Sequence, residues 1–177
     1  MKNFLRLTLT LVVVCAAAAG ALAFVNQITM PKIIEQAKIE KGLALREVSQ
    51  GADEFKEVVQ NRVFDALKGG EKTGSVILTK AQGYSGNIDI AFGVSPDGLL
   101  VGIKILSQTE TPGLGAKVAG RPFLDQFVGK GADAVILKKD DPDGGSIDAV
   151  SAATVSSRVV TNAVRAALDS YKKGELQ

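Results

Sequence analysis

Residues 88–105 read IDIAFGVSPDGLLVGIKI, and this stretch decides the fold. Apolar side chains recur at every second position over 88–94 and again over 101–105, which is the period of a half-buried β-strand. The Ser-Pro-Asp-Gly run at 95–98 suits a tight turn, because proline presets φ and glycine tolerates a positive φ. The sequence therefore predicts an antiparallel β-hairpin.

The clearest helical pattern lies near the end of the chain. Apolar side chains recur there at helical spacing and form one stripe, while charged side chains take the other faces. The members of the stripe are Val159, Val160, Ala163, Val164, Ala167, Leu168 and Tyr171. The pattern predicts a helix that begins at Ser156 or Ser157 and ends at about Lys173, before Gly174.

Shorter segments complete the expected fold. Residues 75–81 and 134–137 are typical of strands, and residues 123–128 are typical of a short helix. The segment 51–70 leaves two interpretations open, because the apolar positions near Phe55 suit a helix, whereas Val63-Phe64 suits the start of a strand. Antiparallel strands with helices towards the chain ends indicate an α+β fold, in which an antiparallel sheet packs with helices.

The composition excludes several kinds of function. The 177 residues contain no histidine and one cysteine, Cys15. A Ser-His-Asp triad, a haem held by histidine, an iron–sulfur cluster and an internal disulfide are therefore excluded, and a hydrolase has little support. A net charge of +2 with interspersed signs argues against a nucleic-acid-binding surface. Redox chemistry in this chain requires an organic cofactor.

An uncharged apolar run at residues 7–25 predicts a membrane-spanning helix, since about 20 such residues cross a bilayer. Lys2 and Arg6 precede the run, which favours an N-terminus inside the cell and the remaining chain outside. Ala21-Leu22-Ala23 also fits a signal-peptide cleavage site, so a cleaved leader remains the alternative to a retained anchor. Both interpretations place the rest of the chain outside the cytoplasm.

These patterns predict five parts along the chain. They are a cytoplasmic N-terminus at 1–6, a transmembrane helix at 7–25, a stalk with the start of the outer domain at 26–73, the main outer domain at 74–173 and a tail at 174–177. Within the stalk, Pro31 suits the first turn of a helix whose apolar face continues to about Lys41. We therefore expect a helix to begin near Pro31.

Glu110-Thr111-Pro112-Gly113-Leu114-Gly115 directly follows the hairpin and is the first candidate binding segment. Pro112-Gly113 suits the two central positions of a type II turn. The two glycines on either side of Leu114 would let the backbone come close to a flat ligand. A plain surface turn is the alternative. The segment lacks the third glycine of a dinucleotide fingerprint and the Lys-Ser or Lys-Thr pair of a P-loop.

The run DAVSAATVSS at 148–157 leads into the last helix and is the second candidate segment. A helix N-cap needs one side-chain oxygen, yet five of these residues carry a hydroxyl or a carboxylate. A helix N-terminus also favours a phosphate group. A simple cap remains the alternative.

The acidic run at 140–145 resembles the start of a calcium loop, but Ala152 stands where a bidentate Glu is required, so we expect a solvated turn.

The two segments together resemble the flavin-binding domain shared by the G subunit of the Rnf electron-transport complex and the C subunit of the sodium-translocating NADH:quinone reductase. In that family, the threonine that closes a Ser-Gly-Ala-Thr motif bears FMN through a phosphoester bond, and an acidic residue precedes the motif. Asp148, Ser151, Ala153 and Thr154 occupy the matching positions. Ala152 replaces the usual glycine, which would strain the loop if that position needs a positive φ.

The resemblance extends from about Gly74 to Tyr171 and implies that residues 74–173 form an FMN-binding domain. It implies covalent FMN on Thr154, placed there by a flavin transferase that moves FMN from FAD and reads the segment containing Asp148 and Ser151. It implies no catalytic residue and no metal ligand. We further expect the other family signature to lie against the flavin ring, through Glu110, Thr111, Gly113, Leu114 and Gly115.

The implied function is electron transfer by a single-pass protein of the cytoplasmic (inner) membrane, with its soluble domain on the periplasmic or extracellular side. The chain would work with the other membrane subunits of an ion-translocating ferredoxin:NAD oxidoreductase (Rnf) complex, as a redox subunit and not as a complete enzyme. Its short length favours the Rnf G subunit over the C subunit of the quinone reductase. A stand-alone anchored flavoprotein and a flavin-free partner-binding module also remain open.

Overall fold

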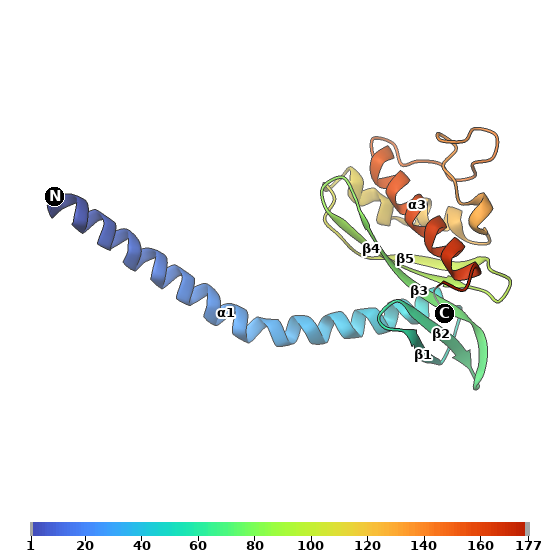
Figure 1. Ribbon diagram of the computed structural model, residues 1–177, viewed down its shortest axis with the longest axis horizontal. Helices are drawn as coiled ribbons and strands as arrows, with labels where there is room; N and C mark the ends of the chain where they lie inside the picture. Colours follow the sequence, from blue (N-terminus) through green and yellow to red (C-terminus); the bar gives the residue numbers. More distant parts are fainter. Residues whose placement is uncertain (1, 176–177) are drawn as a thin grey trace. The chain divides into compact units, whose positions relative to one another are not determined.

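The computed structural model describes residues 2–175, so Met1 and the last two residues of the predicted tail lie outside it. The chain divides into two parts at Glu40. Helix α1 spans Lys2–Val48 and includes the predicted membrane-spanning run (Figure 1). Within residues 2–175 it is the one helix that is long and apolar enough to cross a membrane.

The expectation of a helix that begins near Pro31 is wrong. Pro31 lies inside α1, which continues without interruption to Val48. A proline within a helix removes one backbone hydrogen bond, and here the residues on both sides still keep the helical conformation.

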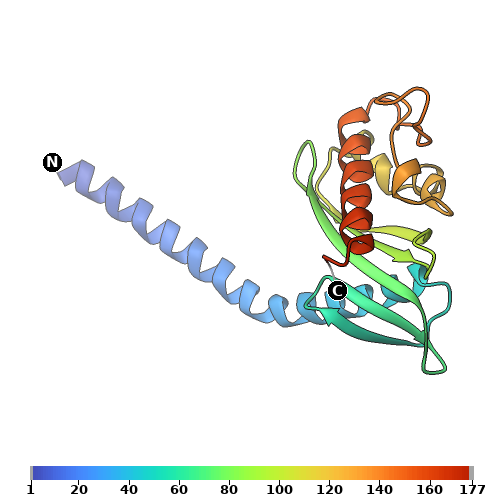
Figure 2. The same cartoon turned by 45° about the vertical axis from the view of Figure 1, so that its right-hand side comes forward.

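Five strands form one antiparallel sheet in the order β1-β2-β3-β4-β5, so each strand pairs with its neighbour in sequence (Figures 1 and 2). The strands are β1 (Glu54–Val59), β2 (Val63–Lys68), β3 (Glu71–Gln82), β4 (Asn87–Val94) and β5 (Leu100–Gln108). The predicted α+β class is confirmed, and so is the predicted strand at 75–81, which lies within β3.

The predicted hairpin is confirmed as β4 and β5. Phe92 lies opposite Ile103, and the turn between the strands is closed by the N–H of Gly98, which donates to the Ser95 carbonyl at 2.9 Å. Gly98 has a φ of +78°, as its place in the turn requires. The ambiguous segment 51–70 forms β1 and β2, so the helical interpretation near Phe55 is wrong.

Helix α3 (Thr154–Lys172) crosses one face of the sheet (Figures 1 and 2). Its apolar stripe buries Val160, Val164 and Leu168 completely, in the same core as Phe92. The prediction of this helix is confirmed, although it begins at Thr154 and not at Ser156 or Ser157. The predicted short helix at 123–128 corresponds to α2 (Arg121–Leu124) and the 3-10 turn η2 (Asp125–Phe127).

The predicted strand at 134–137 is wrong. The 3-10 turn η3 occupies Ala132–Ala134, and Leu137 forms only an isolated bridge with Ile147. The carbonyl of Ile136 accepts bonds from the N–H groups of Ser146 and Ile147, at 2.9 and 3.0 Å. This apolar run therefore pairs with a nearby loop and not with the sheet. A further 3-10 turn, η1 (Gly115–Ala119), precedes α2.

The last turn of α1 belongs to the same part of the chain as the sheet and packs closely against it. Gly93 and Gly102 lie opposite each other in β4 and β5, and a Cβ built on either would collide with the backbone of Val48. Two facing glycines therefore make room for the helix backbone. Beside them, Glu47 accepts a hydrogen bond from Lys104 at 2.6 Å, and this bond holds the pKa of Glu47 below its ordinary value.

The position of Phe92 in the core predicts a large effect of Phe92→Ala. Phe92 is fully buried between the sheet and α3, so we expect its truncation to lower the free energy of unfolding by about 3–5 kcal/mol. Chemical denaturation of the chain in non-ionic detergent, followed by circular dichroism, measures this. Val58→Ala, on an exposed position of β1, should change stability by less than about 0.5 kcal/mol. Equal effects of the two variants would contradict the assignment of the core.

Candidate functional site

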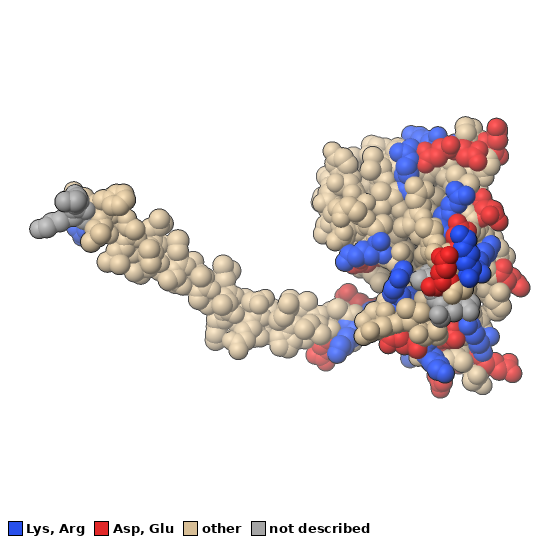
Figure 3. Space-filling model, in the orientation of Figure 1, with Lys and Arg blue, Asp and Glu red and all other residues tan. Residues whose placement is uncertain are grey.

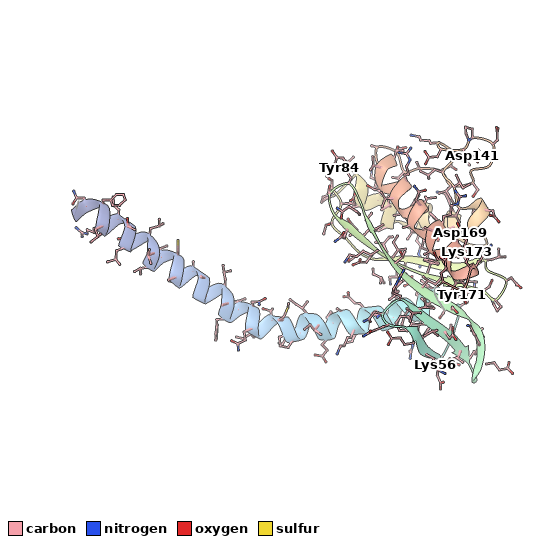
Figure 4. The ribbon with its side chains drawn as sticks, in the orientation of Figure 1. Lys56, Tyr84, Asp141, Asp169, Tyr171 and Lys173 are labelled. Carbon is pink, nitrogen blue, oxygen red and sulfur yellow. The ribbon has the colours of Figure 1, made fainter. Side chains whose placement is uncertain are left out.

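Three segments that are distant in sequence meet at one end of the sheet. They are the turn between β3 and β4, the segment after β5 and the first turn of α3, and together they enclose a cavity of about 350 Å³. Figure 4 labels Tyr84 on the turn between β3 and β4, at the opposite end of α3 from Lys173. The cavity is lined by Tyr84, Glu110, Thr111, Leu114, Gly115, Ala152, Ala153, Thr154, Val155 and Ser156.

The side chain of Glu110 joins all three segments from inside the protein. It is 5% exposed, and its carboxylate accepts hydrogen bonds from the hydroxyl of Ser156 in α3 and from the N–H of Ser85, the latter at 3.0 Å. Burial raises its pKa, but the bonds from Ser156 and from the backbone of residues 84–86 outweigh burial and hold the pKa below its ordinary value. Glu110 is therefore a buried carboxylate whose ionised form is favoured by hydrogen bonds from two other segments.

The glycines around Glu110 serve its packing. A Cβ built on Gly83 or on Gly115 would overlap the Glu110 side chain. Gly113 has a φ of +78°, and the N–H of Leu114 donates to the Thr111 carbonyl at 3.2 Å, as the expected type II turn requires. Gly115, the glycine in η1, thus lets the backbone approach the Glu110 side chain. The expected reason for this glycine was a close approach of the backbone to a ligand.

Thr154 is the first residue of α3 and not its cap. The cap position belongs to Ala153, which has no side-chain oxygen, so no side chain caps the first turn. The half-buried Thr154 lines the cavity, and its Oγ1 accepts a hydrogen bond from Lys139 Nζ at 3.2 Å. An uncapped helix N-terminus with a lysine beside it favours an anion.

Ala152 has a φ of +63°, so the condition under which alanine strains this loop is met. A side chain in the left-handed region costs about 1–2 kcal/mol relative to the ordinary helical region. The strained residue lies two positions before Thr154, in the wall of the cavity.

The predicted site residues divide into two groups. Thr154, Glu110, Thr111, Leu114 and Gly115 line the cavity, whereas Gly113, Asp148 and Ser151 do not. The Asp148 side chain is 65% exposed and forms an ion pair with Lys138 at 2.7 Å, while its N–H donates to Gln126 Oε1 at 2.7 Å. Ser151 is exposed on the surface. The motif that contains Thr154 therefore places some of its polar groups outside the cavity.

Tyr84, Ser156 and Lys139 were not among the predicted site residues, although Ser156 belongs to the candidate segment 148–157. Tyr84 and Ser156 line the cavity, and Lys139 reaches Thr154 from the loop before α3. An aromatic residue between the glycines of the turn at 83–86 was a usable signal for Tyr84. Nothing local in the sequence indicates Lys139.

The acidic run at 140–145 forms a turn in which Asp141 accepts the N–H of Gly144 at 2.9 Å. Residues 2–175 contain no cluster of potential metal ligands.

The rim of the cavity is apolar and exposed. Tyr84, Leu114 and Val155 are 75%, 46% and 48% exposed. In Figure 3, the end of the domain that carries Tyr84 shows no Lys, Arg, Asp or Glu side chain on the visible face. The cavity thus joins an anion-compatible helix terminus to an uncharged surface.

Replacing Glu110 should make stability depend differently on pH. Because the pKa of Glu110 is lowered by folding, its stabilising effect is complete above the ordinary carboxyl pKa and is lost as the pH falls through the lowered value. We expect Glu110→Gln to be less stable than the unmodified chain by about 1–3 kcal/mol at pH 7. Denaturation of both chains at several pH values should show this difference shrinking in acid. A difference that stays constant would contradict an ionised Glu110.

Replacing Ala152 by glycine should relieve strain. Glycine adopts a φ of +63° without a Cβ penalty, so Ala152→Gly should raise the free energy of unfolding by about 0.5–1 kcal/mol after its larger chain entropy is counted. Thermal or chemical unfolding measures the change. As a control, Ala163→Gly within α3, where φ is helical, should be destabilising. A destabilised Ala152→Gly would show that position 152 carries no strain.

The chain resembles known proteins in sequence and in fold. A family model described as an FMN-binding domain matches residues 83–169, which include all three segments of the cavity. The chain is 32% identical to the G subunit of the proton-translocating ferredoxin:NAD(+) oxidoreductase complex of Clostridium ljungdahlii, over 95% of this chain and 91% of that protein. It is also 32% identical to the G subunit of the Na(+)-translocating complex of Acetobacterium woodii, over 97% and 93% of the two chains.

Solved structures of a related protein share the fold. The C subunit of the Na(+)-translocating NADH-quinone reductase from Parabacteroides distasonis is 25% identical with a TM-score of 0.54, and the match covers 63% of this chain and 60% of that one. The G-subunit relatives are more similar and match almost end to end, which confirms the choice of the Rnf branch over the quinone-reductase branch. The chain belongs to the family of the G subunits of the ion-translocating ferredoxin:NAD(+) oxidoreductase (Rnf) complexes.

Proposed function

We propose that this chain is the electron-transferring G subunit of an ion-translocating ferredoxin:NAD oxidoreductase complex and carries FMN covalently on Thr154. The family membership supports the complex and the other membrane subunits as partners. The match to an FMN-binding domain supports the cofactor. The flavin would supply the redox chemistry, and the protein would position it and define its surroundings.

One observation carries the attachment at Thr154, namely the position of this residue. Thr154 lines the cavity and is the first residue of a helix that no side chain caps. The free N–H groups of that first turn and the ammonium of Lys139 suit a phosphate group. The cavity volume of about 350 Å³ is within the range of small-molecule sites, and its exposed apolar rim suits the flat face of a flavin ring.

The attachment requires a separate flavin transferase. Thr154 Oγ1 would form an ester with the FMN phosphorus of FAD while the pyrophosphate bond breaks, so that AMP leaves and the hydroxyl proton is released. Asp148 and Ser151 lie outside the cavity and on the surface. Such positions are accessible to another enzyme. We propose that the flavin transferase recognises the segment through both residues.

The chain is anchored in the membrane through the apolar part of α1. We propose that residues 1–6 are cytoplasmic, that residues 7–25 cross the membrane and that the FMN-binding domain at 74–173 lies on the periplasmic or extracellular side. Lys2 and Arg6 before the apolar run support this orientation. A covalent tether suits that location, because a free flavin would be lost there by dilution.

Replacing Thr154 tests the proposed function directly. The full chain, produced together with a flavin transferase, should give a fluorescent band on a denaturing gel under ultraviolet light and the added mass of FMN. Thr154→Ala should abolish both, because it removes the only oxygen to which the phosphate can bind at this position. Thr79→Ala, on β3 away from the cavity, should keep both. An unmodified chain that stays dark would favour a flavin-free partner-binding module.

A further inference from the structure

We propose that Lys139 is the counter-ion of the flavin phosphate on Thr154. The inference rests on the proposed function, since it assigns a role toward the phosphate that Thr154 would carry. Lys139 lies fifteen residues before Thr154 and outside both sequence motifs. The structure brings its ammonium to 3.2 Å from Thr154 Oγ1.

Three consecutive side chains fasten the loop containing Lys139 to the segment around Thr154. Lys138 forms an ion pair with Asp148 at 2.7 Å, and Asp140 accepts two parallel hydrogen bonds from Arg158, at 2.8 Å to Nε and 2.6 Å to Nη2. These contacts lie on either side of the contact between Lys139 and Thr154. The loop at Lys139 is therefore fixed on both sides, and its ammonium is directed to Thr154 by its own hydrogen bond.

The charges around Thr154 leave Lys139 available for an anion. The carboxylates of Asp148 and Asp140 are taken by Lys138 and Arg158, and the buried carboxylate of Glu110 is bonded to Ser156 and to the turn at 83–86. Within residues 2–175, no carboxylate forms an ion pair with Lys139. Thr154 Oγ1 is a neutral partner, so the lysine charge is unmatched.

A phosphate on Thr154 would supply the matching charge. A phosphorus that is bonded to both the threonine oxygen and the flavin chain keeps one ionised oxygen, so the linkage carries a single negative charge. Its free oxygens lie two bonds from Oγ1, through the phosphorus, and the ammonium of Lys139 already reaches Oγ1. A lysine and the positive end of α3 then face one anion, and an ammonium binds a phosphate as a point charge.

The test compares four full-length chains in detergent, each supplied with flavin transferase and FAD. They are the chain without a substitution (the parent chain), Lys139→Gln, Lys139→Arg and Lys173→Gln. The last is a charge-matched control, because Lys173 lies at the other end of α3 (Figure 4). Intact mass gives the rate of FMN incorporation, and phosphorus NMR of the loaded protein reports the surroundings of the phosphate. Circular dichroism confirms that each exposed substitution leaves the fold unchanged.

We expect Lys139→Gln to move the phosphorus resonance and to slow incorporation about two- to fivefold, the range for a solvent-accessible ion pair. The phosphorus resonance and the incorporation rate of Lys139→Arg should stay near those of the parent chain, and those of Lys173→Gln should match them. A phosphorus resonance that is unchanged in Lys139→Gln, or equally moved in Lys173→Gln, overturns the role of Lys139 while the attachment to Thr154 stands. A parent chain that takes up no FMN overturns both proposals. Failure of the Lys139 role is thus distinguishable from failure of the attachment to Thr154.

Discussion

The buried carboxylate of Glu110 is the interaction on which the candidate site depends. It is bonded to the first turn of α3 and to the turn between β3 and β4, and it extends from the segment that follows β5. A carboxylate that is removed from water needs hydrogen bonds in return, and the bonds of Glu110 connect the three segments. The glycines at 83 and 115 follow from this constraint, since each leaves space that the carboxylate needs.

The fold could be predicted wherever the pattern was local. The hairpin at 88–105 and the helix at the end of the chain follow from strict periodicity over one continuous segment. The strands β1 and β2 have mixed exposure, and their identity depends on pairing, of β1 with β2 and of β2 with β3. The apolar run at 134–137 satisfies its polar backbone with residues 146–147, which no period along the chain can indicate.

The candidate site was predicted in its residues more than in its geometry. The motif at 110–115 indicated a surface that lies against a ligand, yet Glu110 points into the protein and Gly115 accommodates it. Of the motif at 148–157, Thr154 lines the cavity and Asp148 pairs with Lys138 on the surface. A motif indicates that residues are needed together, but burial and contacts decide which of them lies in the cavity. The position of Lys139 beside Thr154 depends on how its loop folds back to α3, which the spacing of residues in the sequence does not show.

The chemistry of the cavity lining has a consequence for protons. Its titratable side chains are Tyr84 and Glu110, and the carboxylate of Glu110 has a lowered pKa and is occupied by donors. The lining therefore offers no free carboxyl group that could deliver or remove a proton. Under the proposed function, no carboxyl group of this lining would serve as a proton relay to the flavin.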